Sequence, residues 1–160
     1  MALCMIGLGL RAVEVATLSL DDIDWRAGVL KVRADKTRRT DLMPLPDRVG
    51  RAMVAYLRQG RPSTVDRHVF VRHRLPRSRP IEVRIVQGAL RRDMLRAGLP
   101  VQAPHKLRHG TASRLLESGA SIKEVADMLR NRSLDTTTIY LKIDTKNLSQ
   151  VAMPWPEVHS

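Results

Sequence analysis

The chain has 160 residues, of which 43% are hydrophobic, so it is long enough to bury a core as one domain, and no apolar run approaches the ~20 residues that span a bilayer. Its single cysteine, Cys4, excludes a disulfide within the chain and fits a reducing cytosol. The net charge of +12 favours nucleic acid as the partner, and an aromatic content of only 3% favours the backbone of a duplex over a stacking platform for single strands.

The first half of the chain predicts a helix followed by a small antiparallel sheet. The apolar start, over residues 2–18, indicates a buried helix and not a signal peptide, because no basic segment precedes it. The stretch "VLKVRA", residues 29–34, alternates apolar and polar side chains as a half-buried strand does, and "DLMPLP", residues 41–46, predicts its partner. Lys36 falls in the loop between these strands. An amphipathic helix is expected next, over residues 47–59.

A basic connector and two further helices are expected after it. Residues 60–80 hold several arginines and prolines, and "HVFV" within them, residues 68–71, predicts one short strand. Residues 82–97 predict a helix that Gly98 ends. The next helix is expected over residues 105–117.

The last third of the chain predicts two more helices. Ser121 and Glu124 have the spacing of a capping box, in which each side chain binds the main-chain N–H of the other residue. Asp135 can cap a final helix that carries Tyr140. Together these elements predict an α+β fold that is mainly helical, with a small antiparallel three-stranded sheet on one edge.

The segment "HKLRHG" places His105 and Arg108 on one face of the first turns of a helix. A helix N-terminus presents free N–H groups to an anion, so an imidazole and a guanidinium there can form a phosphate site. The same pattern fits an ordinary solvated helix start, so the segment alone leaves both interpretations open. His109, one step further round the helix, is expected to pack or hydrogen-bond locally.

The segment "GLGLRAVEV" also allows two interpretations. Gly7, Gly9 and Ala12 match the pattern of a dinucleotide-binding turn, which requires a parallel βαβ unit. The antiparallel strands expected next, and the presence of Arg11 inside the glycine loop, argue against such a turn. In the other interpretation Gly9 ends a helix, so that Arg11, supported by Glu14 one turn later, faces an active site.

Lys36 lies in the predicted hairpin loop among Arg33, Arg38 and Arg39. Positive neighbours and partial burial would favour its neutral form and make it a candidate proton donor. Taken alone, the residue is explained better as an ordinary solvated charge.

Four segments stand in one order along the chain: "GLRAVEVATLSLDDIDW", "DKTRRTDLMPLP", "HKLRHGTASRLLESGASIKEVADML" and "RSLDTTTIYLKID". In that order and spacing they resemble the catalytic domain of the tyrosine recombinases, the phage-integrase and Xer-type family. The resemblance covers nearly the whole chain, with residues 60–100 the least distinctive part. It implies a site-specific reaction that cleaves and rejoins DNA through a 3′-phosphotyrosine intermediate.

The resemblance also implies a role for each matching residue. Arg11 and Arg108 match the two arginines that clamp the non-bridging oxygens of the scissile phosphate, and Glu14 matches the acid that braces the first of them. Lys36 matches the lysine that protonates the leaving 5′-oxygen. His105 matches a histidine that acts as general acid or base, or as a hydrogen-bond donor to the phosphate.

The implied nucleophile, Tyr140, lies in the last matching segment, where it would attack phosphorus. Asn131 stands where the family usually has a histidine, and its amide can donate a hydrogen bond but cannot carry charge. Arg130 stands where the family usually has a glycine, which matters if the position needs a positive φ. No metal or cofactor is implied, because the arginines supply the positive charge.

The resemblance implies DNA contacts and an assembly as well. The arginines expected to bind DNA are Arg33, Arg38, Arg39, Arg130 and Arg132. The catalytic domain is expected over residues 1–145, with the N-terminal core-binding domain of the family absent. Residues 146–160 are expected to form a tail that can pack on a partner or fold back onto its own domain. Double-stranded DNA is the expected partner, with no membrane, a monomer alone and a tetramer on recombining DNA, in the cytoplasm and associated with the nucleoid.

Two alternatives keep DNA as the partner without the reaction. Residues 119–141 can be a helix-turn-helix DNA-binding module, although this leaves Arg11, Lys36 and the H-x-x-R pattern unexplained. The chain can also be a non-catalytic DNA-binding remnant of a recombinase. A merely solubilised or ribosome-associated surface is the plainest explanation of the charge alone.

Overall fold

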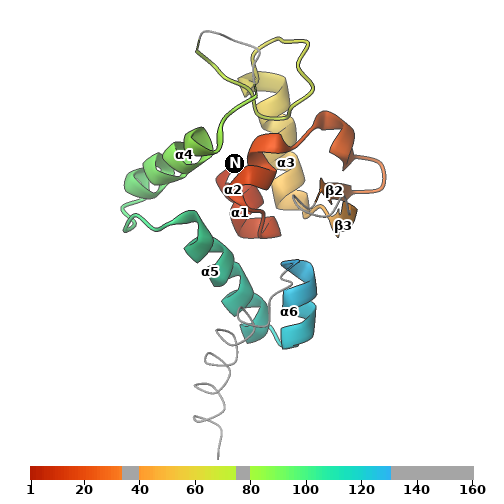
Figure 1. Cartoon of the computed structure of the whole chain (residues 1–160), viewed down its shortest axis with the longest axis vertical. Coiled ribbons are helices and arrows are strands. Elements are labelled where there is room, and N and C mark those ends of the chain that lie inside the picture. Colours follow the sequence, from red (N-terminus) through yellow and green to blue (C-terminus); the bar gives the residue numbers. More distant parts are fainter. Residues whose placement is uncertain (34–39, 75–79, 131–160) are drawn as a thin grey trace, which may run out of the picture. The chain divides into compact units, whose positions relative to one another are not determined.

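The computed structural model describes residues 1–33, 40–74 and 80–130, and the chain divides into two units, residues 1–111 and 112–160 (Figure 1). The boundary between the units falls within one helix, α5 (Pro104–Glu117). None of the helices in the described ranges is long and apolar enough to cross a membrane.

The N-terminal helical segment is broken at Gly9 into α1 (Ala2–Leu8) and α2 (Ala12–Thr17). Gly9 adopts φ 61°, a left-handed conformation that favours glycine, and the Leu10 N–H donates to the Cys4 carbonyl oxygen at 3.4 Å. A single continuous helix is therefore wrong, and the interpretation that Gly9 ends a helix is confirmed. The sheet that follows is antiparallel, whereas a dinucleotide site needs a parallel unit.

A small antiparallel sheet follows α2, as the alternating pattern predicts. Its strand order is β1-β2-β3, and β2 pairs with β3 so that Leu30 lies opposite Met43. Both of these side chains and that of Val32 are buried in the core. The bounds of the strands are β1 (Ile23–Asp24), β2 (Val29–Arg33) and β3 (Thr40–Pro44), and a 3-10 turn, η1 (Leu20–Asp22), precedes them.

Helices α1 to α4 surround the core of the first unit. Helix α1 lies against α2, α3 and α4, and α2 also lies against α4. Helix α3 (Asp47–Ala55) continues into a π turn, η2 (Tyr56–Gly60), and α4 (Val83–Arg96) ends before Gly98, which has φ 67°. Both helices agree with the predicted ones within a few residues. Their buried side chains include Val49, Met53, Val86, Leu90 and Met94.

The predicted strand over residues 68–71 is wrong. In the described residues this segment makes only isolated pairings, such as that of His68 with Ser19. The Arg61 guanidinium donates to the carbonyl oxygens of His68 at 2.8 Å and Val69 at 3.2 Å. In the described hydrogen bonds a side chain, in place of a neighbouring strand, thus supplies the donors to these two carbonyl oxygens.

The described part of the second unit is the end of α5 followed by α6 (Ile122–Met128). Their buried cluster consists of Ala112, Val125 and Leu129. The predicted capping box at the start of α6 is confirmed. The Ser121 N–H donates to Glu124 Oε2 at 2.7 Å, and the Glu124 N–H donates to Ser121 Oγ at 3.2 Å.

Gly7 allows a close approach between α1 and α3. A Cβ at this position would lie 2.7 Å from Val49 Cγ2. We expect Gly7→Ala to lower the free energy of unfolding by about 1–3 kcal/mol, as overpacking of a core does. The matched control is Gly88→Ala in α4, whose Cβ would meet Arg92 Nη1 at 3.6 Å, an ordinary contact. Helix propensity should make this control more stable by about 1 kcal/mol. Urea unfolding measures both variants, and equal effects would contradict the close approach.

Arg130 adopts φ 53° directly after α6, and its N–H donates to the Asp127 carbonyl oxygen at 3.0 Å. The position where the family usually has a glycine therefore does have a positive φ here. We expect Arg130→Gly to have a free energy of unfolding about 1 kcal/mol higher than that of Arg130→Ala. Both changes remove the side chain, but only glycine relieves the backbone. Chemical unfolding of the two variants checks this, and equal stabilities would contradict it.

Candidate active site

Arg11 is held at the N-terminus of α2 by Glu14. The Arg11 N–H donates to Glu14 Oε2 at 2.7 Å, and Arg11 Nη1 donates to Glu14 Oε1 at 3.1 Å. The Glu14 side chain is only 5% exposed, whereas that of Arg11 is 46% exposed. One buried carboxylate thus fixes both the main chain and the guanidinium of this arginine, while part of the guanidinium is open to a ligand.

Arg108, in the second turn of α5, reaches the turn that precedes Arg11. Its Nη1 donates to the Gly9 carbonyl oxygen at 2.5 Å, across 99 residues of sequence. Gly9 lies two residues before Arg11, so both arginines are anchored on the short segment between α1 and α2. This segment is therefore the structural link between the two arginines that the sequence predicts to act together.

His105 lies in the first turn of α5 and is exposed. Its ring centre is 6.1 Å from that of His109, at an interplanar angle of 86°. Burial, and then the positive charges of His105 and Arg108, lower the pKa of His109 below its ordinary value. The lowered pKa favours the neutral form of His109, which packs beside His105 as the sequence predicts.

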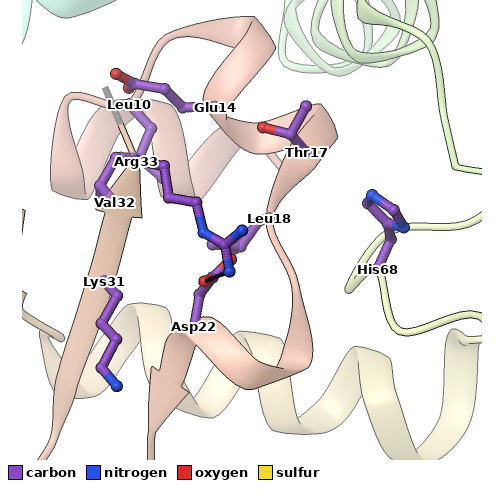
Figure 2. A pocket seen from close by; sticks show the side chains of 9 residues that line it. All are labelled: Leu10, Glu14, Thr17, Leu18, Asp22, Lys31, Val32, Arg33 and His68. Atoms are coloured by element: carbon purple, nitrogen blue, oxygen red, sulfur yellow. Dashed lines mark hydrogen bonds and ion pairs between the residues drawn. The ribbon is translucent and has the colours of Figure 1, made fainter. Parts of the chain in front are cut away.

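A cavity of about 240 Å³, lined by both polar and apolar side chains, lies beside Glu14 in the first unit (Figure 2). Its lining residues are Leu10, Glu14, Thr17, Leu18, Asp22, Lys31, Val32, Arg33 and His68. Pockets that enclose small ligands measure about 300–1,000 Å³, so this cavity is small for a cofactor. In the ranges that the structure describes, no three His, Cys, Asp or Glu side chains gather as metal ligands.

Arg33, one of the predicted DNA contacts, points at Asp22 in this cavity (Figure 2). Its Nη2 donates to Asp22 Oδ1 at 3.1 Å, and the Asp22 side chain is 7% exposed while that of Arg33 is 74% exposed. Asp22 Oδ2 also accepts the Ser19 N–H at 2.9 Å. A buried acid therefore orients Arg33, which leaves the rest of its guanidinium open to solvent.

Several predicted site residues lie outside the described residues, and their roles stay predictions. They are Lys36, Arg38, Arg39, Asn131, Arg132 and Tyr140. Arg130 is described, as the left-handed residue after α6.

Two contacts of the site gave no signal in the sequence. One is the hydrogen bond that Arg108 donates to the Gly9 carbonyl oxygen. The other is the hydrogen bond that Thr111 Oγ1 donates to the Ile6 carbonyl oxygen at 2.8 Å. Both join residues about one hundred positions apart, so no local spacing could indicate them.

Known proteins resemble this chain over nearly its whole length. A model of the Phage integrase family matches residues 1–147. The integrase/recombinase y4rA of Sinorhizobium fredii is 41% identical over 158 residues, which are 98% of this chain and 38% of y4rA. Tyrosine recombinase XerA of Thermococcus kodakarensis is 34% identical over 146 residues, which are 91% of this chain and 51% of XerA.

The fold is that of a solved recombinase. The structure of the XerH site-specific recombinase, bound to palindromic difH substrate after cleavage, matches with a TM-score of 0.77 and 20% identity, over 98% of this chain and 45% of XerH. The chain thus spans about half, or less, of each of these three proteins. The predicted fold, mainly helical with a small three-stranded antiparallel sheet, is confirmed. Since the family model covers all but the last residues, the chain belongs to the phage integrase family, the family of the tyrosine recombinases.

Proposed function

We propose that this chain is the catalytic domain of a site-specific DNA recombinase or integrase that works through a 3′-phosphotyrosine intermediate. The observation that carries the proposal is the anchoring of Arg11 and Arg108 on one short segment. Arg11 is held by Glu14, and Arg108 is held by the carbonyl of Gly9, two residues before Arg11. Two guanidinium groups fixed in this way fit the non-bridging oxygens of a phosphodiester.

The arginines stabilise the transition state. Charge grows on the non-bridging oxygens when a fifth oxygen approaches phosphorus, and fixed cationic donors stabilise that charge without reorganisation. A guanidinium stays protonated at any pH in the cell, so Arg11 and Arg108 supply the positive charge that the phosphate needs. His105, one turn before Arg108, adds a hydrogen bond or a proton transfer at the same phosphate.

Tyr140 and Lys36 perform the two halves of the exchange in this proposal. The phenolic oxygen of Tyr140 attacks phosphorus, the bond from phosphorus to the 5′-oxygen breaks, and Lys36 gives a proton to that oxygen. Asn131 donates a neutral hydrogen bond to the phosphate. Rejoining is the reverse, in which a 5′-hydroxyl attacks the phosphotyrosine, so the bond energy is kept and no nucleotide is consumed. These roles rest on the resemblance of the sequence.

Duplex DNA is the substrate and partner in this proposal. The net charge of +12 favours a polyanion, and the XerH structure holds a DNA substrate. Residues 1–145 form the catalytic domain, and residues 146–160 are a tail that can pack on a neighbouring protomer or fold back onto its own domain. The chain alone is a monomer, and four protomers act on two duplexes in the cytoplasm, at the nucleoid.

Covalent capture tests the proposal. The full chain is incubated with a randomised library of nicked duplexes, in which cleavage releases a short strand and prevents rejoining. We expect a denaturant-resistant, protease-sensitive DNA adduct with the wild type and none with Tyr140→Phe. The matched control is Tyr56→Phe, since Tyr56 packs on Phe70 with ring centres 5.2 Å apart and should be dispensable for the adduct. Equal adduct from wild type and Tyr140→Phe would overturn the proposal.

A further inference from the structure

The C-terminal end of α1 accepts two hydrogen bonds from α5. The last carbonyl groups of a helix lack partners within the helix, so they are available to donors from elsewhere. Thr111 Oγ1 donates to the Ile6 carbonyl oxygen at 2.8 Å, and Arg108 Nη1 donates to the Gly9 carbonyl oxygen at 2.5 Å. The two donors lie one turn apart on α5, and the two acceptors lie at the end of α1.

The contact made by Thr111 differs from that of an ordinary helical threonine. Threonine hydroxyls in helices commonly bond the carbonyl four residues back. Thr111 has such a contact with the Leu107 carbonyl at 3.1 Å, and Thr17 in α2 has one with the Val13 carbonyl at 3.0 Å. Only Thr111, of these two, is buried and also reaches a carbonyl on another helix.

We propose that Thr111 is a positioning residue for Arg108. Its hydroxyl holds the second turn of α5 against the end of α1, so that Arg108 stays on the Gly9 carbonyl and its other N–H groups face the phosphate. This inference rests on the proposed function, because it assigns Thr111 a part in the same phosphate site.

A displacement of the Arg108 guanidinium should slow the cleavage reaction more than it weakens DNA binding. Misplacement of a catalytic group by about 1 Å can cost about 100-fold in rate, whereas DNA affinity is the sum of many phosphate contacts. We therefore expect Thr111→Val to form the covalent adduct about 10- to 100-fold more slowly at saturating DNA. Thr111→Ser, which keeps the hydroxyl, should restore most of the rate.

The control is Ser118→Ala, which removes an exposed hydroxyl at the end of α5 that donates to the carbonyl oxygen of Leu115 on its own helix at 2.7 Å, and it should leave the rate unchanged. Thr111→Ala gives a second variant without the hydroxyl, in case valine disturbs folding. If Thr111→Ser is as slow as Thr111→Val, the methyl packing and not the hydroxyl matters, and the proposal is overturned. Equal rates for Thr111→Val and the wild type would overturn it as well.

A second measurement needs no activity. Hydrogen exchange of the Arg108 guanidinium is followed by NMR in the DNA-free chain, with the signal assigned by its loss in Arg108→Lys. We expect faster exchange in Thr111→Val and Thr111→Ala than in the wild type, Thr111→Ser and Ser118→Ala. Unchanged exchange in both hydroxyl-free variants would overturn the positioning role. If exchange separates the variants while the wild type forms no adduct, Thr111 still orders Arg108, but the proposed function fails and the part of Thr111 in a phosphate site fails with it.

Discussion

Replacing Arg108 with lysine is expected to slow formation of the covalent DNA adduct by about 100- to 1,000-fold, the usual effect of losing one donor to a transition-state oxyanion. Lysine keeps the positive charge, but its ammonium is a point charge and lacks the planar fork of a guanidinium. Arg108 already uses Nη1 on the Gly9 carbonyl oxygen at 2.5 Å. A lysine cannot hold that carbonyl and clamp a phosphate in the same geometry.

Single-turnover kinetics on captured duplexes measure the Arg108→Lys effect. The matched control is Arg96→Lys, which changes an exposed arginine in the last turn of α4. We expect this control to cleave like the wild type. A rate for Arg108→Lys within about threefold of the wild-type rate would show that Arg108 does not stabilise the transition state, since the loss of one such donor lowers the rate far more.

Replacing Glu14 with glutamine is expected to slow the same step by about 100-fold, because it loosens Arg11. Glutamine keeps one oxygen for the Arg11 N–H, which now lies 2.7 Å from Oε2. The other carboxylate oxygen, Oε1, is replaced by an NH₂ group. In the wild type Oε1 accepts from Arg11 Nη1 at 3.1 Å, so the new NH₂ donor would face another donor. Two donors cannot hydrogen-bond to each other, so the guanidinium loses its brace.

Glu124→Gln is the matched control for Glu14→Gln. Glu124 has the same place in its helix, three residues after the N-cap, and its carboxylate also accepts a main-chain N–H, that of Ser121, at 2.7 Å. It braces no arginine in the described contacts, so we expect cleavage at the wild-type rate. Equal slowing by both changes would indicate lost helix stability in place of a loosened Arg11, which urea unfolding of the two variants would reveal.

Local patterns in the sequence predicted the parts of the fold that depend on neighbouring residues. The alternation in residues 29–34 predicted β2, and the spacing of Ser121 and Glu124 predicted the start of α6. Gly9 allowed a helix end or a dinucleotide turn, and the antiparallel strands that follow favoured the helix end. These signals are local because turns, caps and strand faces are set within a few residues.

Side-chain contacts between residues far apart in the sequence account for what the sequence could not predict. Residues 68–71 look like a strand, but the Arg61 guanidinium donates to the carbonyl oxygens of His68 and Val69. Arg33 looks like a plain DNA contact, but the buried Asp22 orients it. The hydrogen bond from Arg108 to the Gly9 carbonyl oxygen joins residues that only the fold brings together.

The most direct test of the proposed mechanism is the chemical identity of the protein–DNA link. The adduct from the nicked-duplex library is digested with trypsin and nuclease, and the modified peptide is sequenced by mass spectrometry. The mechanism predicts a 3′-phosphate joined to the phenolic oxygen of Tyr140, in the peptide of residues 133–142, with a free 5′-hydroxyl on the released strand. A link through a 5′-phosphate, or through any other side chain, would contradict it.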